Sequence, residues 1–280
     1  MPGSETNIQS LVLATDLDVL APDRLVTRRD GYWAVRSPGN PSFWWGNLLI
    51  FDDAPGAGDG ARWEQLFARE FAEVPEVRHR TFTWDRVDGG AGAAEDEFKG
   101  RGYEIERTAG LLARPDEIRP HPRANHEVDI HRLEQDADGG LWAQVIDLQA
   151  AGVPAGIEPA EHRQFLIQRQ HELRELFAAG GGAWFVALED SHVVGSLGIV
   201  VSGGRARYQA VDTAASHRGR GIASRLVVEA ARLTGERHHV DHFVIAADPG
   251  YHAISIYESV GFQRAEVITG AVRRPPGEPA

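Results

Sequence analysis

The stretch RARYQAVDTAASHRGRGIASRLVVEAARL, residues 205–233, decides the fold of this chain. Its first part, Arg205 to Asp212, has the alternating and β-branched pattern of a strand, and apolar residues recur at helical spacing from Ile222 onward. The glycine-bearing turn Arg218 to Gly221 lies between them. The sequence therefore predicts a strand, a tight turn and a helix that starts at or near Gly221.

The start of this helix has the features of an anion-binding turn. A helix N-terminus presents unpaired N–H groups and the positive end of the helix dipole, which suits a phosphate or pyrophosphate. Glycine has no Cβ atom, so a ligand can approach its backbone. Five arginines and one acid lie between residues 203 and 228, in a chain whose formal net charge is -12. An ordinary strand-to-helix turn with solvated arginines is the alternative.

A second motif follows at residues 248–262, DPGYHAISIYESVGF. The turn itself reads Arg-Gly-Arg-Gly-Ile-Ala over residues 218–223, which matches Arg/Gln-x-x-Gly-x-Gly/Ala. In this order the two motifs resemble the GCN5-related N-acetyltransferases, the GNAT superfamily. The resemblance covers residues 128–273 and implies an acetyl-coenzyme A-dependent N-acetyltransferase.

The resemblance also assigns roles to individual residues. It implies that Tyr257, in Tyr-Glu-x-x-Gly-Phe, approaches the cofactor sulfur and protonates the departing thiolate. The strand edge would bind the pantetheine arm through backbone groups and polarise the thioester carbonyl. The expected cofactor-binding residues are Val211, Asp212, Thr213, Arg218, Gly219, Arg220, Gly221, Ile222 and Ala223.

The chain departs from the family pattern at the general base. Some members carry a glutamate on the signature strand, whereas the comparable place here holds Arg207-Tyr208. The asparagine common before the alanine of the second motif is also missing, since His252 precedes Ala253. Asp212 and the acids at 189–190 are interpreted as turn or solvated residues, so no base is assigned. The other reading is a non-catalytic acyl-CoA sensor or interaction protein.

The first half of the chain repeats the pattern of the second at an offset of 159 positions. Gly261 falls on Gly102, and the helix near Ile222 falls on a predicted helix near Trp63. The chemistry is not repeated, because Asp59 to Glu64 replaces the turn and Phe98 replaces the tyrosine. We expect a degenerate half that does not bind coenzyme A.

Composition restricts the class of protein. A 42% hydrophobic share supports packed cores, and zero cysteines exclude disulfides and an acyl-cysteine intermediate, so acyl transfer should be direct. The absence of a long apolar run or a signal segment predicts a cytoplasmic protein without a membrane span. The acidic balance argues against nucleic acid and favours an amine of a small molecule or peptide as substrate. A homodimer is compatible with the sequence.

Patterning predicts an α/β (α+β) protein with two mixed, mostly antiparallel GNAT-like sheets flanked by helices. The expected domains are 1–113, a Pro-rich linker at 114–125, a catalytic domain at 126–273 and a loose tail at 274–280. Tryptophans and phenylalanines at 43–84 are interpreted mainly as core, with a ligand pocket as the alternative. No metal site is expected, because His238, His239 and His242 lack supporting carboxylate or cysteine ligands.

Overall fold

The structure is a computed structural model that describes residues 7–134, 137–153 and 157–275. It is an α+β fold with one mixed sheet of eleven strands, in the order β1-β2-β3-β4-β11-β5-β10-β9-β8-β7-β6. The prediction of two separate sheets is therefore wrong. Its error lies in the two closing strands, β5 (Glu104–Ala113) and β11 (Gln263–Arg273), which are neighbours in the middle of a single sheet. Periodicity identifies a strand but not its partner.

The chain divides into two compact units, residues 1–110 with 266–280 and residues 111–265. The end of β11 belongs to the first unit because it pairs antiparallel with β4, from Gly270↔Thr83 to Arg273↔Arg80. The expected tail falls largely on residues 276–280, outside the described residues.

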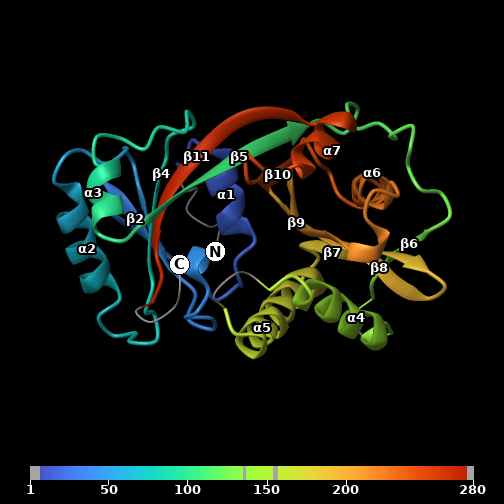
Figure 1. Cartoon of the computed structure of the whole chain (residues 1–280), viewed down its shortest axis with the longest axis horizontal. Helices are drawn as coiled ribbons and strands as arrows, with labels where there is room; N and C mark the ends of the chain where they lie inside the picture. Colours follow the sequence, from blue (N-terminus) through green and yellow to red (C-terminus); the bar gives the residue numbers. More distant parts are fainter. Residues whose placement is uncertain (1–6, 135–136, 154–156, 276–280) are drawn as a thin grey trace. The chain divides into compact units, whose positions relative to one another are not determined.

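The elements of the first unit, apart from the two closing strands, are α1 (Leu11–Asp18), β1 (Leu25–Arg29), β2 (Tyr32–Arg36), η1 (Trp44–Gly46), β3 (Leu48–Phe51), α2 (Asp59–Glu70), β4 (Arg80–Trp84) and α3 (Glu95–Gly100). In this unit, β1–β2 and β2–β3 pair antiparallel and β3–β4 pair parallel, and the helices α2 and α3 lie beside these strands (Figure 1). Phe51 stacks on Trp63 with ring centroids 3.6 Å apart, and Phe82 and Phe98 are fully buried. These aromatic residues are core, as the sequence indicated.

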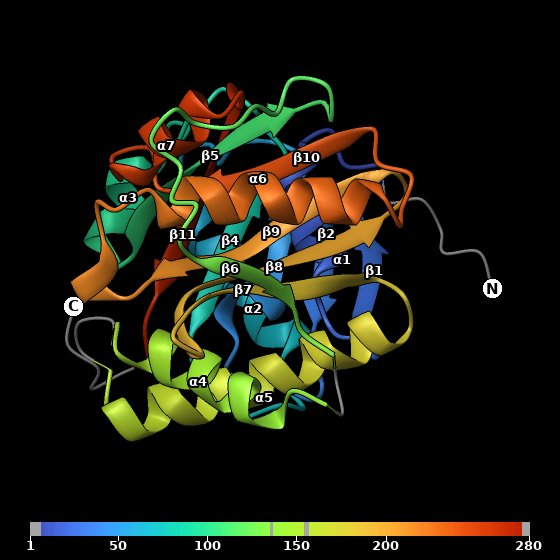
Figure 2. The same ribbon diagram turned by 90° about the vertical axis from the view of Figure 1, so that its right-hand side faces the viewer.

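The second unit places helices on both faces of its strands. Its elements are β6 (Asp129–Arg132), α4 (Gly139–Ala150), α5 (Pro159–Ala178), β7 (Gly182–Glu189), β8 (His192–Ser202), β9 (Arg205–Thr213), η2 (Ala215–His217), α6 (Ile222–Gly235), β10 (His242–Ala247) and α7 (Ala253–Ser259). Figure 2 shows α4 and α5 against one face of β6–β9 and α6 against the other. No helix of the described residues is long and apolar enough to cross a membrane.

The element order repeats between the halves. Moving β5 forward by the offset of 159 gives residues 263–272, which is β11 within one residue, and α3 falls on α7 in the same way. The parallel pair β3–β4 corresponds to the parallel pair β9–β10. The structure also contains β1 and the short 3-10 helix η1, neither of which was predicted from the sequence.

Candidate functional site

The two strands β9 and β10 separate halfway along their length. Their parallel register runs from His242↔Arg205 to Val244↔Arg207, although β9 continues to Thr213. On its other side β9 pairs with β8 as far as Gly195↔Thr213. The β10-facing edge of β9 therefore carries backbone groups that a ligand can pair with, where Val211, Asp212 and Thr213 were predicted to bind the pantetheine arm.

A β-bulge lies at the start of this free edge. Gly198 pairs with Gln209 and Ser196 pairs with Asp212, so three positions on β9 match two on β8. Ala210 takes a left-handed backbone with φ 43°, which is uncommon for a residue with a side chain. Bulges of this kind redirect side chains and often lie beside functional sites. No feature of the sequence indicated it.

The turn before α6 presents a row of free backbone donors. Gly219 (φ 74°) and Gly221 (φ 77°) both have left-handed backbones, and Gly221 is the N-cap. Within the described chain, the N–H groups of residues 219–223 donate to no protein acceptor. This arrangement, together with the helix dipole, fits the pyrophosphate of a nucleotide cofactor.

Gly221 has a second reason to be glycine. A Cβ atom there would lie 1.9 Å from the carbonyl oxygen of Arg123, in the linker, and the Asn125 N–H donates to the Gly221 carbonyl at 3.2 Å. By contrast, a Cβ atom on Gly219 would meet nothing within 4 Å. The sequence suggested that both glycines clear space for a ligand. The structure shows that Gly221 also makes room for the linker.

Two of the five arginines of the basic stretch are paired with carboxylates. Arg220 binds Glu189, which also accepts a hydrogen bond from His217 at 3.0 Å, and these partners lower the pKa of Glu189. Arg225 binds Glu229. Arg218 donates instead to the Thr213 carbonyl at 3.3 Å. The backbone donors and Arg218 are therefore the groups of this turn that can attract an anion without displacing a carboxylate of the described residues.

Tyr257 lies on α7 and is buried, with 6% of its surface exposed. Burial is the main cause that raises its pKa to about 12, with smaller contributions from Tyr251 and the nearby Asp212. Its hydroxyl makes no hydrogen bond to the described residues. Tyr257 therefore keeps its proton at neutral pH and has it available for a ligand.

The helix α2 of the first unit begins at Asp59, four residues before the offset of 159 places it, so Asp59 to Glu64 is helix and not the turn that the sequence predicted; its start is closed by carboxylates of the same unit. The N-cap of α2 is Gly58, with the same left-handed backbone (φ 84°) as Gly221. However, Asp59 accepts a hydrogen bond from the Gly56 N–H at 2.8 Å, and Glu97 accepts one from the Gly58 N–H at 2.9 Å. Two negative charges thus occupy the place where a phosphate would bind, and the tyrosine position holds the buried Phe98.

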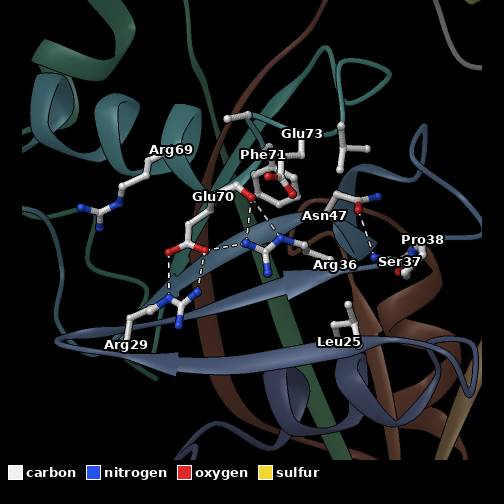
Figure 3. A pocket seen from close by; sticks show the side chains of 12 residues that line it. Leu25, Arg29, Arg36, Ser37, Pro38, Asn47, Arg69, Glu70, Phe71 and Glu73 are labelled. Atoms are coloured by element: carbon white, nitrogen blue, oxygen red, sulfur yellow. Dashed lines mark hydrogen bonds and ion pairs between the residues drawn. The ribbon is translucent and has the colours of Figure 1, made fainter.

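A cavity of about 620 Å³ lies elsewhere in the first unit, between β1, β2 and the end of α2 (Figure 3). Glu70 lies between Arg29, at 2.9 Å, and Arg36, at 2.5 Å, and Tyr32 donates to it at 2.9 Å. The hydrogen bond from Arg29 is the largest of the causes that lower the pKa of Glu70 to about 2. The charged groups of this cavity are thus bound to one another, which is the arrangement of a structural ion-pair network.

The described residues contain no cluster of three histidine, cysteine or acidic side chains that could hold a metal ion. His239, one of the three histidines considered above, contacts Asp241 at 3.1 Å and is largely exposed.

Comparisons with known proteins agree with this geometry. Residues 180–264 match the family model of the acetyltransferase (GNAT) domain. No curated protein matches the sequence.

Three solved structures share the fold over nearly the whole chain. A conserved protein of unknown function from Staphylococcus epidermidis has a TM-score of 0.69 at 13% identity, covering 90% of this chain and 95% of the other.

The other two are described as acetyltransferases of this type. A GCN5-related N-acetyltransferase from Kribbella flavida has a TM-score of 0.63 at 15% identity and covers 95% of both chains. A tandem GNAT protein from the clavulanic acid biosynthesis pathway has a TM-score of 0.56 at 15% identity, with 96% of this chain and 88% of that one covered. Residues 180–264 thus match a GNAT acetyltransferase domain, and the chain as a whole shares the fold of these solved structures.

Proposed function

We propose that the chain is an acetyl-CoA-dependent N-acetyltransferase. In this proposal the C-terminal half transfers an acetyl group directly to a primary amine of a small molecule or peptide. The observation that carries it is the row of free N–H groups at residues 219–223, next to the unpaired edge of β9. The N-terminal half keeps the fold, but carboxylates occupy two N–H groups at the start of α2, those of Gly56 and Gly58, so we propose that it binds no cofactor.

The residues at this site fit the parts of acetyl-CoA. The N–H groups of residues 219–223 would hold the pyrophosphate, and the side chain of Arg218 lies at the same turn without a carboxylate hydrogen-bond partner among the described residues. Backbone groups of Val211 to Thr213 would pair with the amides of the pantetheine arm. A strand-edge N–H would also stabilise negative charge on the carbonyl oxygen.

When bound, acetyl-CoA supplies the acetyl group as a thioester: the amine nitrogen bonds to the carbonyl carbon, the carbon–sulfur bond breaks, and a thiol leaves. Tyr257 would donate its hydroxyl proton to the sulfur. It stays protonated at neutral pH, because its pKa is raised to about 12, and its hydroxyl has no competing acceptor among the described residues. The chain contains no cysteine, so the acetyl group passes to the amine without a cysteine acyl intermediate.

Two measurements test this function. Calorimetric titration with coenzyme A should give one site per chain, and a thiol-release assay with acetyl-CoA should detect turnover on some members of an amine panel. Tyr257→Phe should keep the affinity for coenzyme A and lower kcat by about 10- to 100-fold, because it loses the proton but not the ring. Binding without turnover on any amine would favour the sensor, and two sites per chain would contradict a closed N-terminal half.

A further inference from the structure

Asp212 lies on the sheet face opposite to the one that strand alternation assigns to it. Tyr208 is four positions earlier and faces α6, where its hydroxyl donates to the Val227 carbonyl at 2.8 Å. Without the bulge, residues 208 and 212 would point to the same face. The extra residue at Ala210 reverses the alternation, and Asp212 instead accepts a hydrogen bond from Gln149 on α4.

Two buried glutamine side chains, Gln149 and Gln170, fix which end of the Gln149 amide faces Asp212. Gln170 on α5 donates to the side-chain oxygen of Gln149 at 3.0 Å, and both residues are less than 10% exposed. Since the Gln149 oxygen is occupied, its NH₂ group is the one that faces Asp212. The carboxylate is thereby held in place from α4 and α5, while its other acceptor positions stay available.

Two polar atoms near this carboxylate are buried without a partner. Ser196 on β8 is directly opposite Asp212, so their side chains lie on the same face, and its hydroxyl has no hydrogen bond. The side-chain oxygen of Gln170 is also buried and unpaired. Buried polar groups are normally satisfied, so these two unpaired atoms mark an incompletely bonded polar cluster around Gln149. Asp212 itself is only half-buried.

The location connects this group of residues with the proposed chemistry. Asp212 sits on the free end of β9, where the thioester is expected, and it is close enough to Tyr257 for its charge to raise the pKa of the phenol. The charged and titratable groups that act on Asp212 are Arg218, which favours the ionised carboxylate, and Tyr257. Burial outweighs Arg218 and Gln149 and raises the pKa of Asp212, which makes it a stronger base than an exposed aspartate.

We propose that Asp212 binds the acceptor as a cationic primary amine and takes its proton, with Gln149 and Gln170 as positioning residues. This inference rests on the proposed function. The ammonium gives one proton to the carboxylate, and the freed nitrogen forms its bond to the carbonyl carbon as the carbon–sulfur bond breaks. Tyr257 protonates the sulfur and recovers a proton from the new amide nitrogen. Asp212 then releases its proton to water, so one proton leaves per acetyl group transferred.

The substrate class follows from the same atoms. The half-buried carboxylate of Asp212 favours a positively charged amine over a neutral hydroxyl group. Diamines and amino sugars meet this requirement, whereas the corresponding diols and sugars lack the positive charge. We therefore expect 1,4-diaminobutane and glucosamine to bind and 1,4-butanediol and glucose not to bind.

Asp212→Asn tests the assignment, with Asp190→Asn as the control because Asp190 is an exposed aspartate of the same unit. In the presence of coenzyme A, where no acetyl group can move, the amines should raise the melting temperature of the wild type and of Asp190→Asn but not of Asp212→Asn. In turnover at pH 7, Asp212→Asn should lower kcat/KM for the amine about 100-fold or more. This kcat/KM should rise again at alkaline pH, where the amine is already unprotonated, and the KM for acetyl-CoA should be unchanged. Gln149→Leu should reduce the same kcat/KM by a smaller factor.

The outcomes separate the two proposals. One outcome is that the wild type acetylates amines while the kcat/KM of Asp212→Asn stays within threefold of the wild-type value for each amine. In that case the role of Asp212 is refuted and the proposed function stands. The role of Asp212 is also refuted if the amines raise the melting temperatures of Asp212→Asn and of the wild type equally. If coenzyme A does not bind at all, the proposed function fails, and the assignment of Asp212 fails with it.

Discussion

The two glycines before α6 allow a matched test of the linker contact. Both have left-handed backbones, at φ 74° for Gly219 and φ 77° for Gly221, so alanine at either position should cost about 1–2 kcal/mol in backbone strain. Only at Gly221 would the new Cβ atom meet neighbours, at 1.9 Å from the Arg123 carbonyl oxygen and 3.1 Å from the Asn125 nitrogen. These are backbone atoms, so no side-chain rotation can relieve the contact.

The linker would therefore have to move away from α6. That displacement breaks the hydrogen bond from Asn125 to the Gly221 carbonyl, which is worth about 1 kcal/mol. Gly221→Ala should thus lower the free energy of unfolding by at least about 1 kcal/mol more than Gly219→Ala. In a domain of this size the difference corresponds to a melting temperature lower by about 2–4 °C.

The assay is denaturant unfolding of both variants, followed by titration with coenzyme A. Gly219→Ala places its methyl group in open space at the free N–H row, so its larger effect should be on affinity for coenzyme A. Gly221→Ala should lose both stability and affinity. Equal unfolding free energies for the two variants would refute the linker contact as the reason for glycine at 221.

Three further outcomes concern the first unit. Glu70→Gln should lower the free energy of unfolding by about 3 kcal/mol, measured by denaturation, because it leaves Arg29 and Arg36 without their buried counter-charge. Asp52→Asn, in the exposed pair with Arg28, should lower it by under about 1 kcal/mol. Since the pKa of Glu70 is lowered to about 2, its contribution is present above pH 4.5 and should be lost as the pH falls toward 2. Burial lowers the pKa of His79 from 6.5 to about 4, so stability should fall by about 3 kcal/mol as the pH drops through that range, and His79→Gln should show a flatter profile.

The order and type of most elements could be predicted from sequence, because they depend on local patterns. α6 begins at Ile222, next to its glycine turn, as the sequence predicted. The repeat is also visible in the sequence: at the offset of 159, α3 and β5 fall within one residue of α7 and β11, whereas α2 begins four residues before the position that matches the start of α6. What failed was the pairing of β5 and β11, because either closing strand has the same alternation whichever strand lies beside it.

The candidate site was only partly predictable for a related reason. The motif located the turn at 218–223 and Tyr257, whereas the position of Asp212 depends on one extra residue in β9 and on amides from two distant helices. One signal was available in the sequence. Gln149 shares a helix face with the buried Trp142 and Val145, and a polar residue on such a face indicates a buried hydrogen-bond partner.

The two halves show how a duplicated fold can lose a ligand while keeping its backbone. Gly58 and Gly221 start their helices with nearly the same left-handed conformation, so the geometry that exposes N–H groups is present twice. In the first half, Asp59 and Glu97 supply acceptors from within the unit, and a phosphate would have to displace two bound carboxylates. In the second half the donors stay free. The difference therefore lies in the charge of the side chains around the turn, which two or three substitutions can change without altering the fold.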